Sequence, residues 1–306
     1  MEEVTRQKVV VGKKKNSTSS ILEGIKKKLK SYRNHPLSFC LWLIVMLAAL
    51  LTIGVIAFLI GYILVHGIPY LSLDLFQWKY TTENVSMMPA IINTIIMTGV
   101  ALLIAVPLGI GSAIYLVEYA KRGNKLVPII RLMSETLSAI PSIVYGLFGM
   151  LFFVITLKMG YSILAGALTI AIMILPLILR TTEEALLSVP DSFREGSFGL
   201  GAGKLRTVFR IVLPSAVPGI LAGVILAIGR IVGETAALMY TAGSVSSAAD
   251  SLFASGRTLS VHMYCLSNEG LYTNQAYATA VVLLGIVMLI NGLSAFLAKK
   301  IAKGEK

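Results

Sequence analysis

Uncharged apolar stretches alternate with polar segments along the chain, and each stretch is long enough to cross a lipid bilayer. A helix rises 1.5 Å per residue and needs about 20 apolar residues to span ~30 Å of hydrocarbon. Five stretches reach this length without a charged residue: 38–65, 87–117, 136–157, 159–179 and 270–298. A sixth, 217–240, is apolar but contains Arg230 and Glu234. The pattern therefore predicts an all-α membrane protein with six transmembrane helices.

The composition supports this prediction. Of the 306 residues, 56% are hydrophobic and only 14% are charged, and the mean hydropathy is +0.81. An ordinary soluble domain has about 25% charged residues, so the composition excludes a water-soluble globule. The apolar stretches are continuous rather than alternating, which argues against a transmembrane β-barrel.

The basic residues are confined to every second loop. If the N-terminus is cytoplasmic, three Lys and Arg lie in the outer segments and 23 lie in the inner segments 1–37, 118–135, 180–216 and 299–306. Short loops rich in Lys and Arg remain in the cytoplasm. The distribution predicts that both termini are cytoplasmic and that the basic tail contacts anionic membrane lipid. It also explains the net charge of +12 without a nucleic-acid partner.

The inner loop 180–216 is much longer than a connection between two transmembrane helices requires. Asp191 or Ser192, after a proline, can cap a short helix that starts just beyond them. This helix would end in the glycine-rich segment 199–203, and a second amphipathic helix, 204–213, would stop at the proline that follows. We expect a helix–turn–helix on the inner membrane face, which would give another protein a rigid element to bind.

The glycine-rich segment is not a nucleotide-binding loop. A P-loop requires Gly, four residues, and then Gly-Lys-Ser/Thr. Here Phe198 stands five positions before Gly203, and Leu205 follows Lys204, so the pattern fails. The three histidines are scattered without metal-ligand spacing. We therefore expect no catalytic residue, no metal site and no ATP hydrolysis by this chain.

Within the inner loop, the spacing resembles that of a known family. Glu-Gly-Ser, three residues, Gly, nine residues and Ile-Val-Leu-Pro resemble the EAA loop of ABC-importer permease subunits. The positions concerned are Glu195, Gly196, Ser197, Gly201, Ile211, Leu213 and Pro214. Gly196 and Ser197 stand where the family has alanines. The resemblance implies that the short helix docks into a groove on a separate ATPase subunit.

Arg230 and Glu234 are the chemically unusual residues of the sixth stretch. If this span enters from the cytoplasm near residue 218, Arg230 lies roughly 18 Å deep, with Glu234 one helical turn further on the same face. A buried Arg costs about 2.5–3.5 kcal/mol at this depth. Two interpretations are open: a structural ion pair between helices, or an oxyanion pathway in which Glu234 holds Arg230. Arg180, at the inner end of the fourth span, is either a snorkelling side chain or a second anion contact.

Three further segments, 140–146, 180–186 and 229–238, resemble the PstA-type permease subunits of phosphate-specific ABC importers. The resemblance implies the type I importer transmembrane fold, inorganic phosphate as substrate, and a multi-pass protein of a prokaryotic plasma membrane. The implied partners are a PstC-type permease subunit, a dimer of PstB-type ATPases that binds ATP and Mg, and an external phosphate-binding protein. No cofactor is expected in this chain.

The resemblance covers about residues 38–298 and leaves the basic tail outside it. We expect a basic cytoplasmic tail at 1–37, a first transmembrane helix at 38–65, an importer core at 87–298 that includes the inner loop, and a short tail at 299–306. Sulfate or molybdate remains an alternative substrate. A self-contained anion channel or secondary transporter is an alternative from another class, although the long inner loop and the lack of an inverted repeat argue against it.

Overall fold

The computed structural model describes residues 36–121 and 123–304, and every regular element in these ranges is helical. The chain divides into two units, Met1–Tyr62 and Ile63–Lys306. The basic tail lies almost wholly outside the described residues, so its contact with lipid stays a prediction.

The first unit contains most of one long helix, α2, at Pro36–Gly67, and the last turn of this helix belongs to the second unit. The helix covers the predicted first span 38–65 with two residues more at each end. Its apolar side chains are exposed; Leu41, for example, retains 57% of its accessible surface. Such a surface suits a helix that is solvated by lipid tails.

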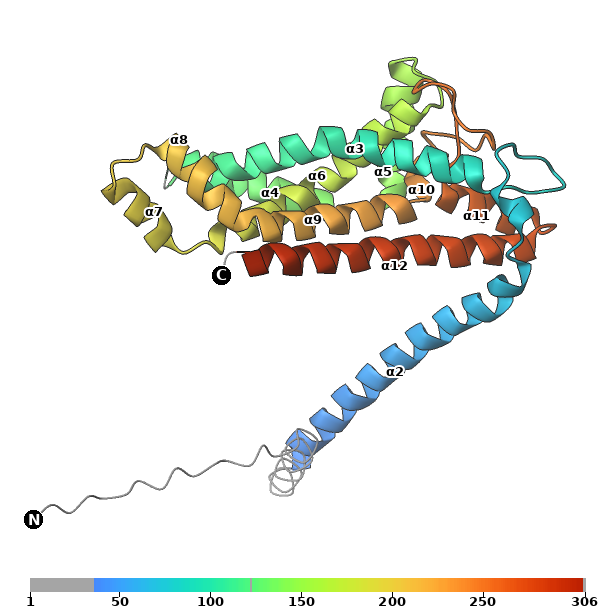
Figure 1. Ribbon diagram of the computed structural model, residues 1–306, viewed down its shortest axis with the longest axis horizontal. Coiled ribbons are helices and arrows are strands. Elements are labelled where there is room, and N and C mark those ends of the chain that lie inside the picture. The colour runs from blue at the N-terminus through green and yellow to red at the C-terminus, as the bar shows by residue number, and fades with distance from the viewer. Residues whose placement is uncertain (1–35, 122, 305–306) are drawn as a thin grey trace, which may run out of the picture. The chain divides into compact units, whose positions relative to one another are not determined.

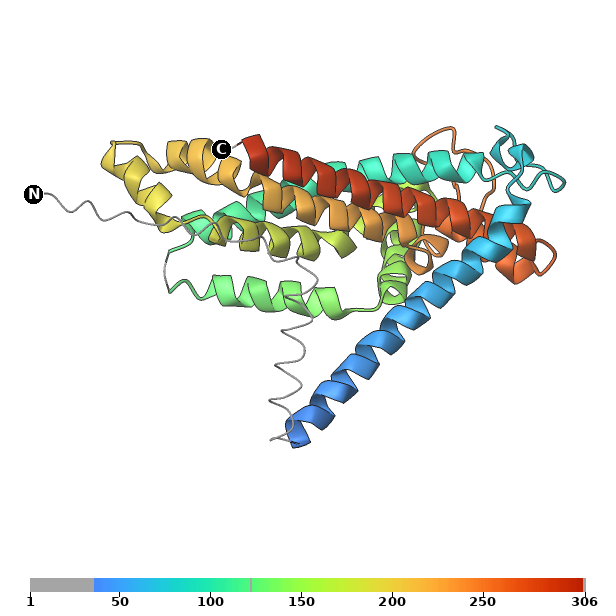
Figure 2. The same cartoon turned by 60° about the horizontal axis from the view of Figure 1, so that its bottom comes forward.

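Four long helices of the second unit lie side by side in Figures 1 and 2. They are α3 (Met88–Ile114), α6 (Ile163–Leu187), α9 (Leu213–Gly233) and α12 (Thr273–Gly304). Helix α3 packs on α6, α6 packs on α9, and α9 packs on α12. Of the four, α6 is the central helix, because two thirds of its most apolar window is buried.

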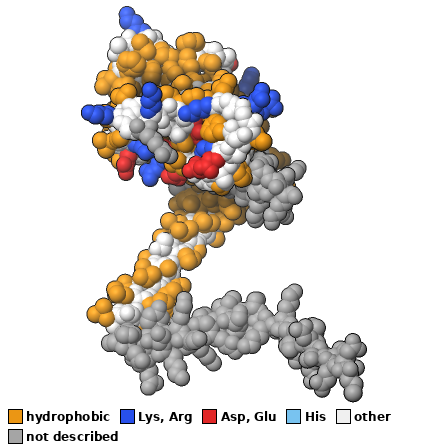
Figure 3. Space-filling view, turned by 90° about the vertical axis from the view of Figure 1, so that its left-hand side faces the viewer, with side chains coloured by type: hydrophobic (Ala, Val, Ile, Leu, Met, Phe, Trp, Pro, Cys, Tyr) orange, Lys and Arg blue, Asp and Glu red, His pale blue; other side chains and the backbone are white. Residues whose placement is uncertain are grey.

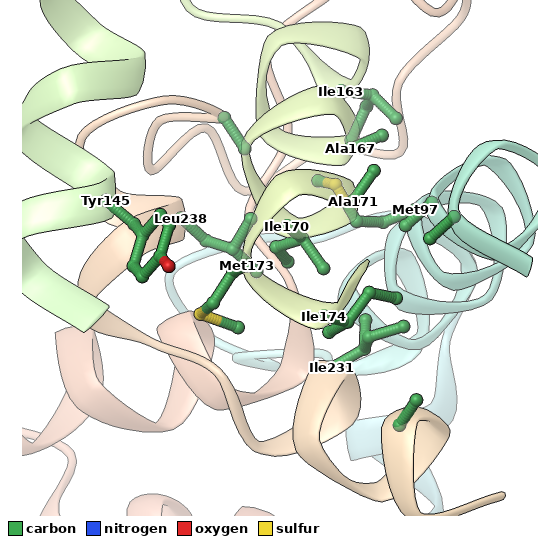
Figure 4. Packing of buried hydrophobic residues seen from close by; sticks show 14 of the residues in the cluster. Met97, Tyr145, Ile163, Ala167, Ile170, Ala171, Met173, Ile174, Ile231 and Leu238 are labelled. Carbon is green, nitrogen blue, oxygen red and sulfur yellow. The ribbon is translucent and has the colours of Figure 1, made fainter. Parts of the chain in front are cut away.

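The largest apolar core joins α3, α6 and α9. Met97 of α3 packs with Ile170 and Ile174 of α6 and with Ile231 of α9. Figure 4 shows these side chains pointing toward one another, with Tyr145 and its neighbours approaching from a fourth helix. The polar ends of the bundle are therefore positioned by a dry, interdigitated centre.

Within residues 36–121 and 123–304, five helical segments could span a membrane by length and composition, or six if one bent pair counts as a single span. The bent pair is α4 (Leu126–Ala139) with α5 (Ser142–Gly149) and its π-helical extension (Met150–Thr156); the two parts meet at 98°. Figure 2 shows α4 running along the long helices and α5 turning across them. The prediction of one continuous helix over 136–157 is therefore wrong, because this span is broken between α4 and α5.

Pro141 explains the break. Proline disfavours the helical conformation of the residue before it, and Ile140 is extended at φ −70° and ψ 130°. The Tyr145 hydroxyl closes the bend by donating a hydrogen bond to the Leu137 carbonyl at 2.8 Å. The bend is thus a stable feature with its own internal hydrogen bond.

The inner loop folds into α7 (Asp191–Gly199) and α8 (Lys204–Thr207), joined by a turn in which Gly201 has φ +81°. The predicted helix–turn–helix is confirmed, but its boundaries differ. Pro190 occupies the N-cap position of α7, and no side chain caps the helix, so the predicted capping role of Asp191 or Ser192 is wrong.

The second helix of the loop does not stop at Pro214. Helix α8 passes through a π-helical segment, Val208–Val212, and continues into α9. Pro214 lies in the first turn of α9, where the loss of an N–H is tolerated. The inner loop and the span that carries Arg230 are therefore one continuous helical segment, Lys204–Gly233.

Asn93 of α3 organises the segment after α9. Its amide donates hydrogen bonds to the carbonyls of Ser247 and Arg257, both at 3.1 Å, and its oxygen accepts one from the Ala249 N–H at 2.9 Å. Asn93 is fully buried. It holds the chain between α10 (Ala236–Met239) and α11 (Leu259–Glu269) against one end of α3.

A buried arginine and a histidine both contact the ring of Tyr80 beside this segment, outside the candidate spans. The Arg257 guanidinium lies over the Tyr80 ring at 4.8 Å, and the His262 ring meets Tyr80 edge-on with centroids 6.1 Å apart. Burial, together with the positive charge of Arg257, lowers the pKa of His262 to about 3. The imidazole is therefore neutral in the folded protein at neutral pH.

Acid should destabilise the fold partly through His262. The unfolded imidazole titrates near pH 6.5. Because the folded pKa is lower, the unfolded state binds the proton more tightly, and stability falls as the pH drops below 6.5. The linkage amounts to about 2 kcal/mol between pH 7 and pH 5. We expect His262→Phe to lose less thermal stability over this interval than the parent, as measured in detergent; an equal loss in both would contradict the assignment.

Candidate functional site

Arg230 lies in the last turn of α9 and is half-buried. Among the described residues, no ion pair or hydrogen bond uses its guanidinium; the ion pairs involve Arg131, Arg180 and Arg194. The bundle thus contains a cation that no described carboxylate neutralises.

Glu234 lies elsewhere than expected. Helix α9 ends at Gly233, and Glu234 is extended at φ −72° and ψ 130°. Its carboxylate accepts a hydrogen bond from the Ala237 N–H at 3.1 Å at the start of α10, and its carbonyl accepts one from the Ser260 hydroxyl. The prediction that Glu234 continues the helix one turn beyond Arg230 is wrong, because the carboxylate satisfies the next helix instead.

Two helix interruptions meet near Arg230, namely the gap between α9 and α10 and the break between α4 and α5. Helix α9 ends there, α10 begins directly afterwards, and α5 packs on α10. A Cβ added at Gly146 of α5 would lie 2.8 Å from the Cα of Ala237, so these backbones are in close contact. Tyr145 and Leu238 belong to one core cluster and lie side by side in Figure 4. Discontinuous helices with polar groups at membrane depth are typical of substrate sites in transporters.

Arg180 has a different environment. It is exposed about two turns before the C-terminal end of α6 and forms an i,i+4 ion pair with Glu184 at 3.3 Å. It lines a cleft of about 260 Å³ together with Arg131, Glu135 and Glu183, and Arg131 pairs with Glu183. This cleft has two arginines and three glutamates, which does not favour an anion. Gly223 lies against Thr181, so Arg180 is separated from Arg230 by roughly 10 Å along the helices.

The EAA-like residues form the end of the molecule that carries α7 and α8. Glu195 and Gly196 are exposed, whereas Ser197 is buried and shares a 2.8 Å hydrogen bond with Thr207. Ser197 stands at a family alanine position and makes a contact that alanine could not make. Beyond the turn at Gly201, the remaining residues lie where the π-helical segment joins α9: Ile211, Leu213 and Pro214.

This end has the features of a docking surface. Lys and Arg side chains surround apolar ones in Figure 3. Phe193, Phe198, Leu200 and Leu205 are exposed, Leu200 to 91%. Basic Arg206 and Arg210 line a neighbouring cleft of about 550 Å³. An apolar patch with a charged rim typically marks a protein–protein contact.

A buried ion pair at the same end was missed by the sequence reasoning. Arg194 of α7 pairs with Glu118 at 2.8 Å, and the side chains are only 15% and 8% exposed. The sequence contains two indications of this pair. Glu118 is the carboxylate that directly follows the uncharged stretch 87–117, and Arg194 stands beside Glu195.

The family model for the binding-protein-dependent transport system inner membrane component matches residues 105–303. The chain belongs to this family. The match includes the broken span, the inner loop and Arg230. It confirms the predicted multi-pass location in the cytoplasmic membrane.

Relatives with curated names indicate which subgroup of this family the chain resembles. The probable ABC transporter permease protein YqgI of Bacillus subtilis is 34% identical over 240 residues, which cover 74% of this chain and 81% of the relative. The phosphate transport system permease protein PstA of Pasteurella multocida is 42% identical over 182 residues, 59% of this chain and 64% of the relative. The PstA 1 protein of Mycobacterium tuberculosis H37Rv is 41% identical over 154 residues, 50% of this chain and 49% of the relative. The predicted PstA-type permease is confirmed, although the match spans only about half to two thirds of the two PstA relatives.

Solved structures show the fold. The inward-facing MetNI methionine ABC transporter has a TM-score of 0.55 at 19% identity and covers 70% of this chain and 94% of the matched chain. A bacterial ABC transporter for the acidic polysaccharide alginate has a TM-score of 0.59 at 18% identity and covers 88% and 98%. The predicted type I importer transmembrane fold is therefore confirmed.

Proposed function

We propose that this chain is the permease subunit of an ATP-driven importer that carries inorganic phosphate across the cytoplasmic membrane. The observation that carries the proposal is Arg230, a cation without a described carboxylate partner near two helix interruptions. The PstA relatives support phosphate as the substrate, since their names state phosphate transport.

Arg230 suits an oxyanion that has lost part of its hydration. Its guanidinium presents five N–H donors in a rigid plane that matches two oxygens of a tetrahedral anion. Because Glu234 is used by α10, the cation keeps its attraction for an anion that enters the pathway. The affinity at this point should be modest, since a deep energy minimum would trap the ion.

The other subunits of the proposed importer would be separate chains. A PstB-type ATPase dimer would bind ATP and Mg and contact the surface formed by α7 and α8. A PstC-type permease subunit would complete the pathway, and an external phosphate-binding protein would deliver the ion. Glu195 is exposed on this surface, which supports a role in the ATPase contact.

Uptake into liposomes that contain the complete complex tests the function. With ATP inside and loaded binding protein outside, we expect phosphate to accumulate at least about tenfold faster than sulfate or molybdate, a difference of ~1.4 kcal/mol in transition-state binding. A preference for sulfate or molybdate would replace the substrate assignment. Phosphate flux without ATP would favour the channel or secondary-transporter alternative.

A further inference from the structure

Arg194 of α7 uses all the N–H groups of its guanidinium. Nε and Nη2 donate to the Glu118 carboxylate at 3.1 and 2.8 Å, and Nη2 also donates to the Leu186 carbonyl at 2.9 Å. Nη1 donates to the Val189 carbonyl at 2.8 Å and to the Asp191 carboxylate at 3.1 Å. An arginine has five such donors, so this one is saturated.

These bonds join parts of the chain that are far apart in sequence. Glu118 lies 76 residues from Arg194 and ends the helix that begins at Met88, whereas Leu186 is at the end of α6. The two charged side chains are 15% and 8% exposed, so water screens them little. Removing one partner would leave the other charge buried without compensation.

A π-helical turn, Tyr115–Tyr119, presents Glu118 to α7. Its next residue, Tyr119, holds the Lys204 ammonium over its ring at 5.2 Å, at the first residue of α8. The turn that ends α3 therefore contacts both helices of the inner loop. Single π turns within α-helices occur frequently at functional sites.

The loop itself is rigid enough to transmit a displacement. The buried Ser197–Thr207 hydrogen bond ties α7 to α8. An apolar cluster in the same region packs Ile114 of α3 with Leu186 of α6 and with Val212, which precedes α9. At its other end, α3 holds the segment 241–258 through Asn93. Helix α3 thus has polar, buried contacts with a loop at each end of the bundle.

We propose that the Glu118–Arg194 pair is the joint that passes a displacement of α7 to α3, and through α3 to the opposite end of the bundle. Both are positioning residues, since their side chains bind each other and the loop around α7. The inference rests on the proposed function, because it takes α7 as the element moved by the ATPase. Energetic coupling of this kind requires contiguous, packed contacts, which these residues provide.

The test uses the complete complex in liposomes and compares Glu118→Gln, Arg194→Gln and the double variant with the parent. Phosphate imported per ATP hydrolysed is measured and normalised to the amount of assembled complex. We expect Glu118→Gln to lower this ratio about tenfold, at the upper range of single-residue coupling effects, while ATP hydrolysis stays within about twofold. The second substitution should add little, because the two residues act as one unit. Glu118→Asp, which keeps the carboxylate, should recover part of the ratio.

The matched control is Glu269→Gln, an exposed carboxylate at the end of α11, which should keep the parent ratio. A parent ratio in assembled Glu118→Gln complexes, or losses that multiply in the double variant, would overturn the inference.

Hydrogen exchange gives a second reading that does not depend on the transported ion. ATP should change the exchange of α7 and of residues 113–119 in the parent, but only that of α7 in Glu118→Gln. If ATP changed the exchange of residues 113–119 equally in the parent and in Glu118→Gln, the proposed role of the pair would also be overturned. If the parent imports no phosphate and the exchange pattern still holds, the proposed substrate fails and the joint stands.

Discussion

Arg230→Gln should abolish phosphate uptake by the complete complex while the ATPase still co-purifies with it. The substitution keeps a hydrogen-bonding side chain but removes the charge and the two-pronged donor geometry. Charge-assisted hydrogen bonds contribute about 1.5–3 kcal/mol each, so the loss of two corresponds to at least about a hundredfold slower uptake. Initial rates of ATP-dependent uptake, corrected for assembled complex, measure the effect.

Two comparisons make this prediction specific. Arg230→Lys keeps the charge but not the planar fork, and it should retain an intermediate rate. Arg180→Gln should have the smaller effect, because Arg180 pairs with Glu184 over a cleft that has more glutamates than arginines. Uptake near the parent rate in Arg230→Gln would show that Arg230 is structural. Equal losses at both arginines would favour a second anion contact at Arg180.

The sequence predicts what local chemistry determines. Five of the six apolar stretches form one helical segment each, because length and hydrophobicity decide whether a segment can span a bilayer, but the bounds of 217–240 were wrong, since that segment runs from Lys204 to Gly233. The helix–turn–helix of the inner loop was equally accessible, since Pro190 and the glycines near Gly201 act within a few residues. The membrane orientation of these elements stays a prediction from charge.

The errors arise where tertiary contacts decide the local structure. Pro141 inside an apolar stretch permits either a kink or a full break, and the Tyr145–Leu137 hydrogen bond stabilises the bend. Glu234 leaves the helical path because two later segments satisfy its carboxylate and its carbonyl. The hydrophobic periodicity of one span does not show which residues of later segments will form these hydrogen bonds.

The Glu118–Arg194 pair was not predicted for the same reason, since it is formed by a tertiary contact. Each residue by itself is an ordinary charge near the inner membrane surface. Only the fold, which brings residues 76 positions apart to 2.8 Å, shows that the pair is buried and that every donor of the arginine is used. Local elements built from contiguous residues, such as α7 and α8, are therefore predictable from one sequence, and connections between distant segments are not.

Gly223→Ala should destabilise the bundle, whereas Gly229→Ala on the same helix should not. A Cβ at Gly223 would lie 2.1 Å from Thr181 Oγ1 and 2.6 Å from Thr181 Cβ, so α9 and α6 would have to separate. Overpacking of this kind costs about 1–3 kcal/mol. A Cβ at Gly229 meets nothing within 4 Å, and alanine is favoured over glycine in helix interiors by about 0.5–1 kcal/mol.

The two variants should therefore move the melting temperature of the detergent-solubilised chain in opposite directions. For a chain of this size, each kcal/mol corresponds to roughly 2–4 °C. Gly223→Val should lower stability further than alanine, since a larger side chain needs a wider separation of the helices. A shift of the same sign and size at both positions would mean that helix propensity, rather than the contact with Thr181, decides stability. Because α6 packs on both α3 and α9, loss of this contact should also reduce ATP-dependent uptake by shifting the helix that carries Arg230.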